Sequence, residues 1–248
     1  MIAVVVVRDG VLPQGADEAV AECAGRALLA GTGTSTAAGD PALRGVATEV
    51  LLAELPGPGF QPAAAAAALA PLLAAEPHVV LPASPDGRDL APRVAALLQR
   101  PLHAGAVAVS PGRIDLARKG GMELHRVAPA PEFVATLLPG VRGVAGAAQA
   151  SGEGSDGAAP AASAAAVAAV HAVATAGNDA TVVAVLPPDP ASIDLSEAPR
   201  IVAAGAGLDG AERIAQLTRI GSAIGASMGA TRVVTDRGWV PHGRQIGT

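Results

Sequence analysis

Residues 200–248 contain the pattern that most constrains how this chain can fold. An apolar run at Ile201–Ala204 leads into a glycine turn that reads G-A-G-L-D-G, from Gly205 to Gly210, and a long amphipathic stretch follows. A second apolar run and a Gly/Pro-rich segment complete the pattern. This order predicts a β-α-β nucleotide-binding unit, because glycines let the backbone approach a phosphate and a helix N-terminus attracts it.

Apolar side chains after the turn recur at helical spacing and predict one helix face, formed by Ile214, Leu217, Ile220 and Ile224. We predict a second strand over 232–235 that ends in Asp236. The pattern fits an NAD site in which Asp236 binds a ribose hydroxyl. It also fits a turn whose glycines only cap the junction between strand and helix.

Residues 1 to about 140 show apolar runs that alternate with helical patterns, which predicts an α/β domain with a mainly parallel sheet. The expected strands cover 2–7, 46–55, 79–82, 102–109 and 122–127. The expected helices cover 16–30, 62–75 and 88–99, with Asp86 as the N-cap of the last one.

Residues 141–199 have a different composition, rich in Ala, Gly and Ser over 144–180. We interpret them as a linker with an alanine helix near 161–174, followed by a connecting strand over 181–186. The predicted domains are therefore 1–140, 141–199 and 200–248.

Charge and composition argue against several classes of protein. The net charge is −5 and no basic block is present, which argues against a nucleic-acid surface. The single cysteine, Cys23, excludes an internal disulfide and a thiolate metal cluster. The apolar run 2–7 is too short for a signal peptide, and Pro160 and His171 interrupt the weakly apolar alanine tract 158–176. We expect no membrane insertion and a cytoplasmic location.

Three segments carry a family resemblance: IVAAGAGLDG at 201–210, IGASMGATRVVTDRGWVPHGRQIG at 224–247 and LPASPDGRDLAPRVAALL at 81–98. They resemble the α subunit of electron transfer flavoproteins, the family that includes FixB. Its members typically show a VAGGRGL turn, then G-A-[ST]-R, G-[WF]-V-P and Q-[VI]-G-Q-T-G. The resemblance spans residues 82 to 248, and two separate signatures in the right order make it specific.

The resemblance implies a partial Rossmann-like FAD-binding domain at 200–248, in which Gly205 and Gly207 approach the cofactor. It gives the hydroxyl of Thr231 a hydrogen bond to FAD and places the guanidinium of Arg232 over the flavin ring. A fixed cation there stabilises negative charge on reduced flavin, and a charge pair at ~5 Å with an effective dielectric of ~20 is worth roughly 3 kcal/mol before screening.

The last family motif along the sequence is the flavin loop. Gln245, Ile246 and Gly247 match its start, where backbone amides should face the cofactor, and Thr248 falls where the family has glutamine. Ala206 stands where the family usually has an arginine. Because the family continues with further strand–helix units, we expect a C-terminally truncated chain with about half a flavin site.

The predicted function is that of an electron carrier without a substrate of its own, and thus not an enzyme. It would take electrons from flavin dehydrogenases through FAD and pass them to a quinone-linked or similar acceptor, with an electron transfer flavoprotein β subunit as partner. Two alternatives stay open: an NAD(P)-binding oxidoreductase fragment that uses Gly205 to Gly210 and Asp236, and a cofactor-free assembly subunit.

Overall fold

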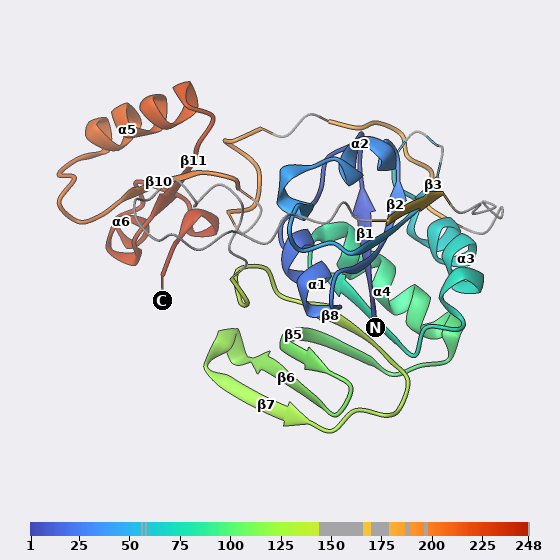
Figure 1. Cartoon of the computed structure of the whole chain (residues 1–248). Helices are drawn as coiled ribbons and strands as arrows, with labels where there is room; N and C mark the ends of the chain where they lie inside the picture. The colour runs from blue at the N-terminus through green and yellow to red at the C-terminus, as the bar shows by residue number, and fades with distance from the viewer. Residues whose placement is uncertain are drawn as a thin grey trace, which may run out of the picture. The chain divides into compact units, whose positions relative to one another are not determined.

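The computed structural model describes residues 1–55, 57, 59–143, 166–169, 179–186, 189–195 and 198–247 (Figure 1). The chain divides into two compact units, Met1–Val183 and Ala184–Thr248, and each is described by itself. The division into 1–140, 141–199 and 200–248 stays a prediction, since much of 141–199 lies outside the described residues.

The first unit is built on one large sheet. Its parallel strands are β1 (Ile2–Val7), β2 (Arg26–Gly31), β3 (Glu49–Glu54), β4 (His78–Pro82), β5 (Leu102–Ser110), β8 (Phe133–Leu137) and β9 (Ala166–Ala169). Two antiparallel strands, β6 (Arg113–Arg118) and β7 (Glu123–Val127), extend the sheet beyond β5. The described strands lie in the order β7-β6-β5-β8-β4-β1-β2-β3-β9.

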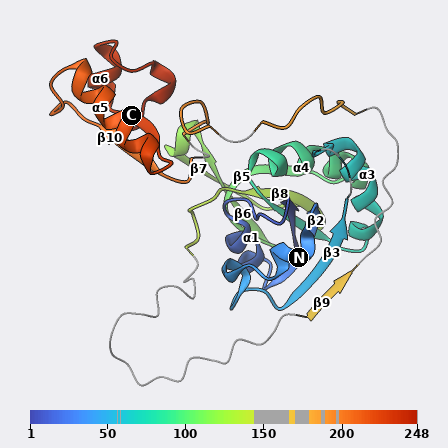
Figure 2. The same cartoon turned by 90° about the horizontal axis from the view of Figure 1, so that it is seen from above.

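Helices cover both faces of this sheet (Figure 2). Helix α1 (Ala16–Glu22), the short α2 (Thr34–Ala38) and the 3₁₀ turn η1 (Pro41–Leu43) lie on one face, while α3 (Pro62–Leu73) and α4 (Pro85–Leu98) lie on the other. Alternate residues of β1 therefore enter different cores, with Val5 packed among residues of α1 and Val4 among residues of α3 and α4. Burial on both sides explains why β1 is a continuous apolar run. The predicted α/β fold is confirmed.

Two boundaries in this unit differ from the prediction. The helix expected over 16–30 ends at Glu22, and its second half is β2. Gly25 makes the turn between them with φ +85°, and a Cβ on it would lie 2.6 Å from the carbonyl oxygen of Val46. Helix α4 is capped by Ser84, whose hydroxyl accepts from the amide of Gly87 at 3.2 Å, and not by Asp86.

Further differences concern strands. The expected alanine helix lies mostly outside the described residues, but its described part, Ala166–Ala169, is the strand β9. Residues 181–186 are described and do not form the expected connecting strand. The strand expected over 122–127 is β7, preceded by the 3₁₀ turn η2 (Lys119–Gly121), while β6 and β8 were not predicted.

The second unit contains a small βαβ motif. Strand β10 (Ile201–Ala204) pairs in parallel with β11 (Ser227–Ala230), and α5 (Ala211–Ala223) connects them. Helix α6 (Arg232–Asp236) and the 3₁₀ turn η4 (His242–Arg244) follow. The predicted strand at 232–235 is therefore wrong in position. Those residues form the short helix α6 instead, in which Val234 is buried in the core of this unit.

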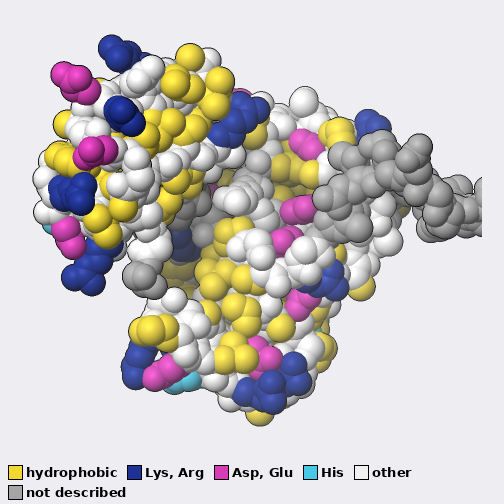
Figure 3. All heavy atoms as spheres, turned by 90° about the vertical axis from the view of Figure 1, so that its left-hand side faces the viewer, with side chains coloured by type: hydrophobic (Ala, Val, Ile, Leu, Met, Phe, Trp, Pro, Cys, Tyr) yellow, Lys and Arg dark blue, Asp and Glu magenta, His cyan; other side chains and the backbone are white. Residues whose placement is uncertain are grey.

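The surface mixes charge types. On the face shown in Figure 3, Lys and Arg side chains are interspersed with Asp, Glu and hydrophobic side chains. Among the described residues, no group of His, Cys, Asp and Glu is arranged to hold a metal ion. No helix in the described part of the chain has both the length and the apolar character needed to cross a membrane.

Candidate functional site

The candidate site lies where both strands of the second unit end. Ala204 and Ala230 are register partners at the carboxyl ends of β10 and β11, and the amide of Thr231 donates to the carbonyl of Ala204 at 2.9 Å. The glycine turn and the pair Thr231–Arg232 therefore leave the sheet at the same edge. This is the edge at which parallel α/β units bind their ligands.

The glycine turn faces open space. A Cβ placed on Gly205, Gly207 or Gly210 would have no atom within 4 Å. Gly210, with φ +110°, is the N-cap of α5 and has no side chain with which to cap the first amides. The first amides of this 13-residue helix thus lie beside an unobstructed turn, which is the arrangement that suits a phosphate group.

Thr231 carries an unused polar group. Its Oγ1 atom is buried and has no hydrogen-bond partner within the described structure. A buried hydroxyl without a partner costs about 1–3 kcal/mol. A ligand that bonds this hydroxyl would offset that cost, so the residue present here fits the hydrogen-bonding role that the resemblance implies.

Arg232 is the first residue of α6 and its side chain is 74% exposed. The guanidinium pairs with the carboxylate of Asp236, one helical turn away, with 3.4 Å between Nε and Oδ2. Since β11 ends at Ala230, Asp236 lies at the end of a helix rather than at the end of a strand. The NAD(P) alternative loses the residue on which it depended.

The segment that matches the flavin loop returns to the same edge. Gln245 forms a bridge with Ala230, and its side-chain oxygen accepts from the hydroxyl of Thr235 at 3.0 Å. The amide of Ile246 donates to the carbonyl of Ala230 at 2.8 Å, so this amide faces the strand and not a cofactor. Gly247 is exposed with φ +74°, and Thr248 lies outside the described residues.

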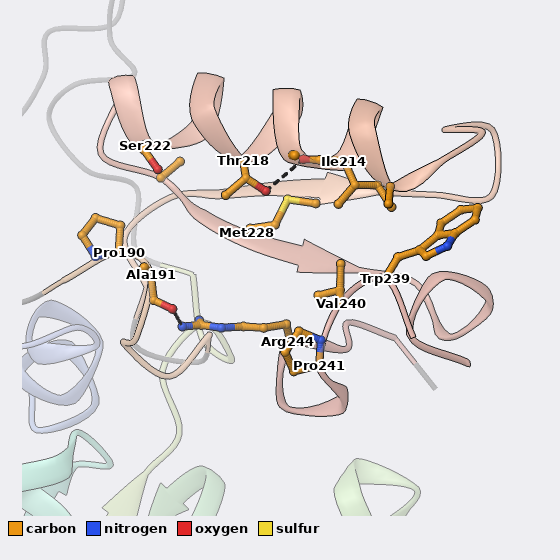
Figure 4. Close-up of a pocket in the computed structure, with 13 residues that line it drawn as sticks. Pro190, Ala191, Ile214, Thr218, Ser222, Met228, Trp239, Val240, Pro241 and Arg244 are labelled. Atoms are coloured by element: carbon orange, nitrogen blue, oxygen red, sulfur yellow. Dashed lines mark hydrogen bonds between the residues drawn. The ribbon is translucent and has the colours of Figure 1, made fainter. Parts of the chain in front are cut away.

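The second unit also contains a pocket of about 430 Å³, whose lining includes neither the glycine turn nor Thr231 and Arg232 (Figure 4). Its wall is mostly apolar and includes Ile214, Ala215, Met228, Trp239, Val240 and Pro241. Arg244 also lines it and extends toward Ala191, where its guanidinium donates to the carbonyls of Ala191 and, at 2.6 Å, Ile193. Sequence reasoning missed Arg244, whose only signal was its place directly before Gln245.

Two glycines that shape this unit were also missed. A Cβ on Gly221 in α5 would lie 2.6 Å from Cγ2 of Val202, and one on Gly229 in β11 would lie 2.9 Å from Cγ2 of Ile246. Both positions therefore need glycine for close packing. Isolated glycines inside otherwise regular elements are the signal that marks such positions.

Comparisons with known families define the class of protein. Residues 16–151, more than half of the chain, match the electron transfer flavoprotein domain. Residues 194–248 match the electron transfer flavoprotein FAD-binding domain of α type. These matches agree with an α/β first unit and with an open glycine turn in the second.

The chain belongs to the electron transfer flavoprotein family. It is an α-type member, and the match of its second unit identifies FAD as the cofactor.

Individual relatives match over a short stretch. The mitochondrial electron transfer flavoprotein subunit alpha of Oryza sativa subsp. indica is 43% identical over 54 residues, which are 22% of this chain and 15% of the relative. The electron transfer flavoprotein subunit alpha of Chromohalobacter salexigens is 46% identical over 59 residues, 24% of this chain and 13% of the relative. The chain thus matches about one seventh of the length of these relatives.

Proposed function

We propose that this chain is the α-type subunit of a cytoplasmic electron carrier and has no catalytic activity of its own. It takes electrons from flavin dehydrogenases through FAD, delivers them to a quinone-linked or similar acceptor and assembles with an electron transfer flavoprotein β subunit. The observation that carries the proposal is the unpartnered buried hydroxyl of Thr231 beside exposed Arg232, at the edge where the glycine turn opens.

Each of these groups has a defined task toward FAD, which when bound accepts and releases electrons. Gly205 and Gly207 leave room for the pyrophosphate, and Thr231 supplies a hydrogen bond. Arg232 supplies a fixed positive charge that stabilises added negative charge in a site of lowered dielectric. Gln245 contributes an amide side chain that Thr235 already orients by a hydrogen bond.

A cofactor-free assembly subunit is the second candidate, and three observations favour it. Ala206 offers no side chain to a phosphate, the amide of Ile246 is already bonded to Ala230, and the described sheet of this unit has two strands. Two-stranded sheets are marginally stable by themselves.

The visible absorption spectrum of the purified chain, prepared with its β-type partner, separates the two candidates. We expect flavin absorption bands that the Thr231→Ala variant weakens, because that change removes the free hydroxyl. The Thr218→Ala variant is a matched control, since the Thr218 hydroxyl already donates to the carbonyl of Ile214 at 2.9 Å within α5. A colourless complex that still assembles would favour the cofactor-free subunit.

A further inference from the structure

The charged residues at the two ends of α6 have signs that do not stabilise a helix. Arg232 is its first residue and Asp236 is its last, with no acidic residue in the first turn and no basic residue in the last turn. A helix N-terminus is stabilised by acidic side chains and a C-terminus by basic ones. Both charges of this pair therefore oppose the helix dipole.

The ion pair between Arg232 and Asp236 offsets little of this unfavourable interaction with the helix dipole. Arg232 and Asp236 are four residues apart, but the basic residue comes first, which is the less favourable order for such a pair. The two side chains are 74% and 54% exposed, so solvent screens their attraction. Arg237, next to Asp236, directs its guanidinium to the ring of Trp239, 4.9 Å from the ring centroid. An exposed pair of this kind contributes at most about 1 kcal/mol, and the helix dipole opposes it, so stability is a weak reason for a carboxylate at position 236.

We propose that Asp236 acts through Arg232 and sets how much of its positive charge a bound flavin experiences. This inference rests on the proposed function. A guanidinium with a carboxylate 3.4 Å away forms a dipole, whose potential falls off faster with distance than that of a lone charge. Asp236 therefore lowers the midpoint potential that Arg232 alone would give.

Asp236→Asn tests this proposal in the FAD-loaded protein with its β-type partner. Asparagine has nearly the shape of aspartate but carries no charge, so the substitution removes the charge and changes little else. We expect the equilibrium constant for one-electron reduction of FAD to rise about threefold or more, where tenfold equals about 59 mV. Asp189→Asn is the matched control, because it removes one exposed carboxylate of the same unit and keeps an oxygen that can accept from the amide of Ala191. Its effect should be clearly smaller.

A second background shows whether Asp236 acts through the arginine. In the Arg232→Ala protein, or in Arg232→Gln if the alanine variant releases FAD, Asp236→Asn should raise the potential much less. An unchanged or lowered potential in Asp236→Asn, an equal rise in Asp189→Asn, or an equal rise in both backgrounds would overturn the proposal.

Thermal unfolding of the chain alone supplies a measurement that needs no flavin. Because both charges oppose the helix dipole, Asp236→Asn should unfold at the same temperature as the unmodified chain or at a higher one. A lower unfolding temperature would show that the carboxylate is present for stability and would overturn the proposal. Absence of FAD from the unmodified complex would instead refute the proposed function, and this inference with it.

Discussion

Arg232→Ala is the substitution that tests the electron-carrier function most directly. The side chain is 74% exposed, and its ion pair with Asp236 spans 3.4 Å. Exposed pairs of this kind contribute about 0.2–1 kcal/mol. We therefore expect the substitution to change the free energy of unfolding by less than about 1 kcal/mol, so that the protein still folds.

The same substitution should have a measurable effect on the midpoint potential of bound flavin. A charge pair at ~5 Å and an effective dielectric of ~20 is worth roughly 3 kcal/mol. Solvent exposure and the neighbouring Asp236 carboxylate reduce this interaction energy. If about one third of it remains, loss of Arg232 lowers the midpoint potential of FAD by about 40 mV for one electron. The potential falls because the reduced flavin loses a nearby positive charge.

Redox titration of the complex with its β-type partner measures this shift. Arg237→Ala is the control, since this exposed arginine lies five positions further along and stacks on Trp239. Its potential should stay close to that of the unmodified protein. An unchanged potential in Arg232→Ala, with flavin still bound, would refute the reasoning.

Three further predictions concern cofactor affinity, the glycine turn and the buried thiol. The chain alone should bind FAD weakly in a fluorescence titration, because Ala206 offers no side chain and the Ile246 amide is occupied, and each 1.4 kcal/mol lost is about tenfold in affinity; stoichiometric yellow protein would contradict this. Ala206→Arg, which restores the residue typical of the family, should tighten FAD binding or raise the flavin potential, and no change in either would mean that the turn points away from the cofactor. Burial raises the pKa of the Cys23 thiol to about 12, so a thiol reagent at pH 8 should modify it only at the rate of unfolding, and immediate modification of the folded chain would show that the thiol is accessible.

Apolar character and length predicted the large elements and failed where small residues form strands. The run at 2–7 is continuously apolar and the stretch at 62–75 is rich in alanine after a proline, and they correspond to β1 and α3. Strand β11 reads SMGA and carries no period-2 signal, while Val233 and Val234 suggested a strand although they lie in α6. Val234 is buried within α6, so tertiary packing at residues 232–236 overrides the β-propensity of valine.

The candidate site was predictable in its residue types and unpredictable in its contacts. The glycine turn and the pair Thr231–Arg232 followed from the motif and the family resemblance, and the structure brings them to one edge. The pairing of Arg232 with Asp236 depended on α6, which the sequence pattern did not indicate. The bonds of Arg244 to carbonyl groups about fifty residues earlier have no sequence signal at all.

The hydrogen bonds of Arg244 link two distant stretches of the second unit that its two strands do not connect. Arg244 joins the stretch by which the chain enters the unit, at Ala191 and Ile193, to the 3₁₀ turn η4, of which it is the last residue. If either the stretch at 191–193 or the turn η4 detaches, the hydrogen bonds of Arg244 break at both places. The intervening chain of about fifty residues is then a free loop, and closing it again costs conformational entropy. The unit should consequently open in a single step, with the amides of β10 and Ile246 exchanging their hydrogens at similar rates.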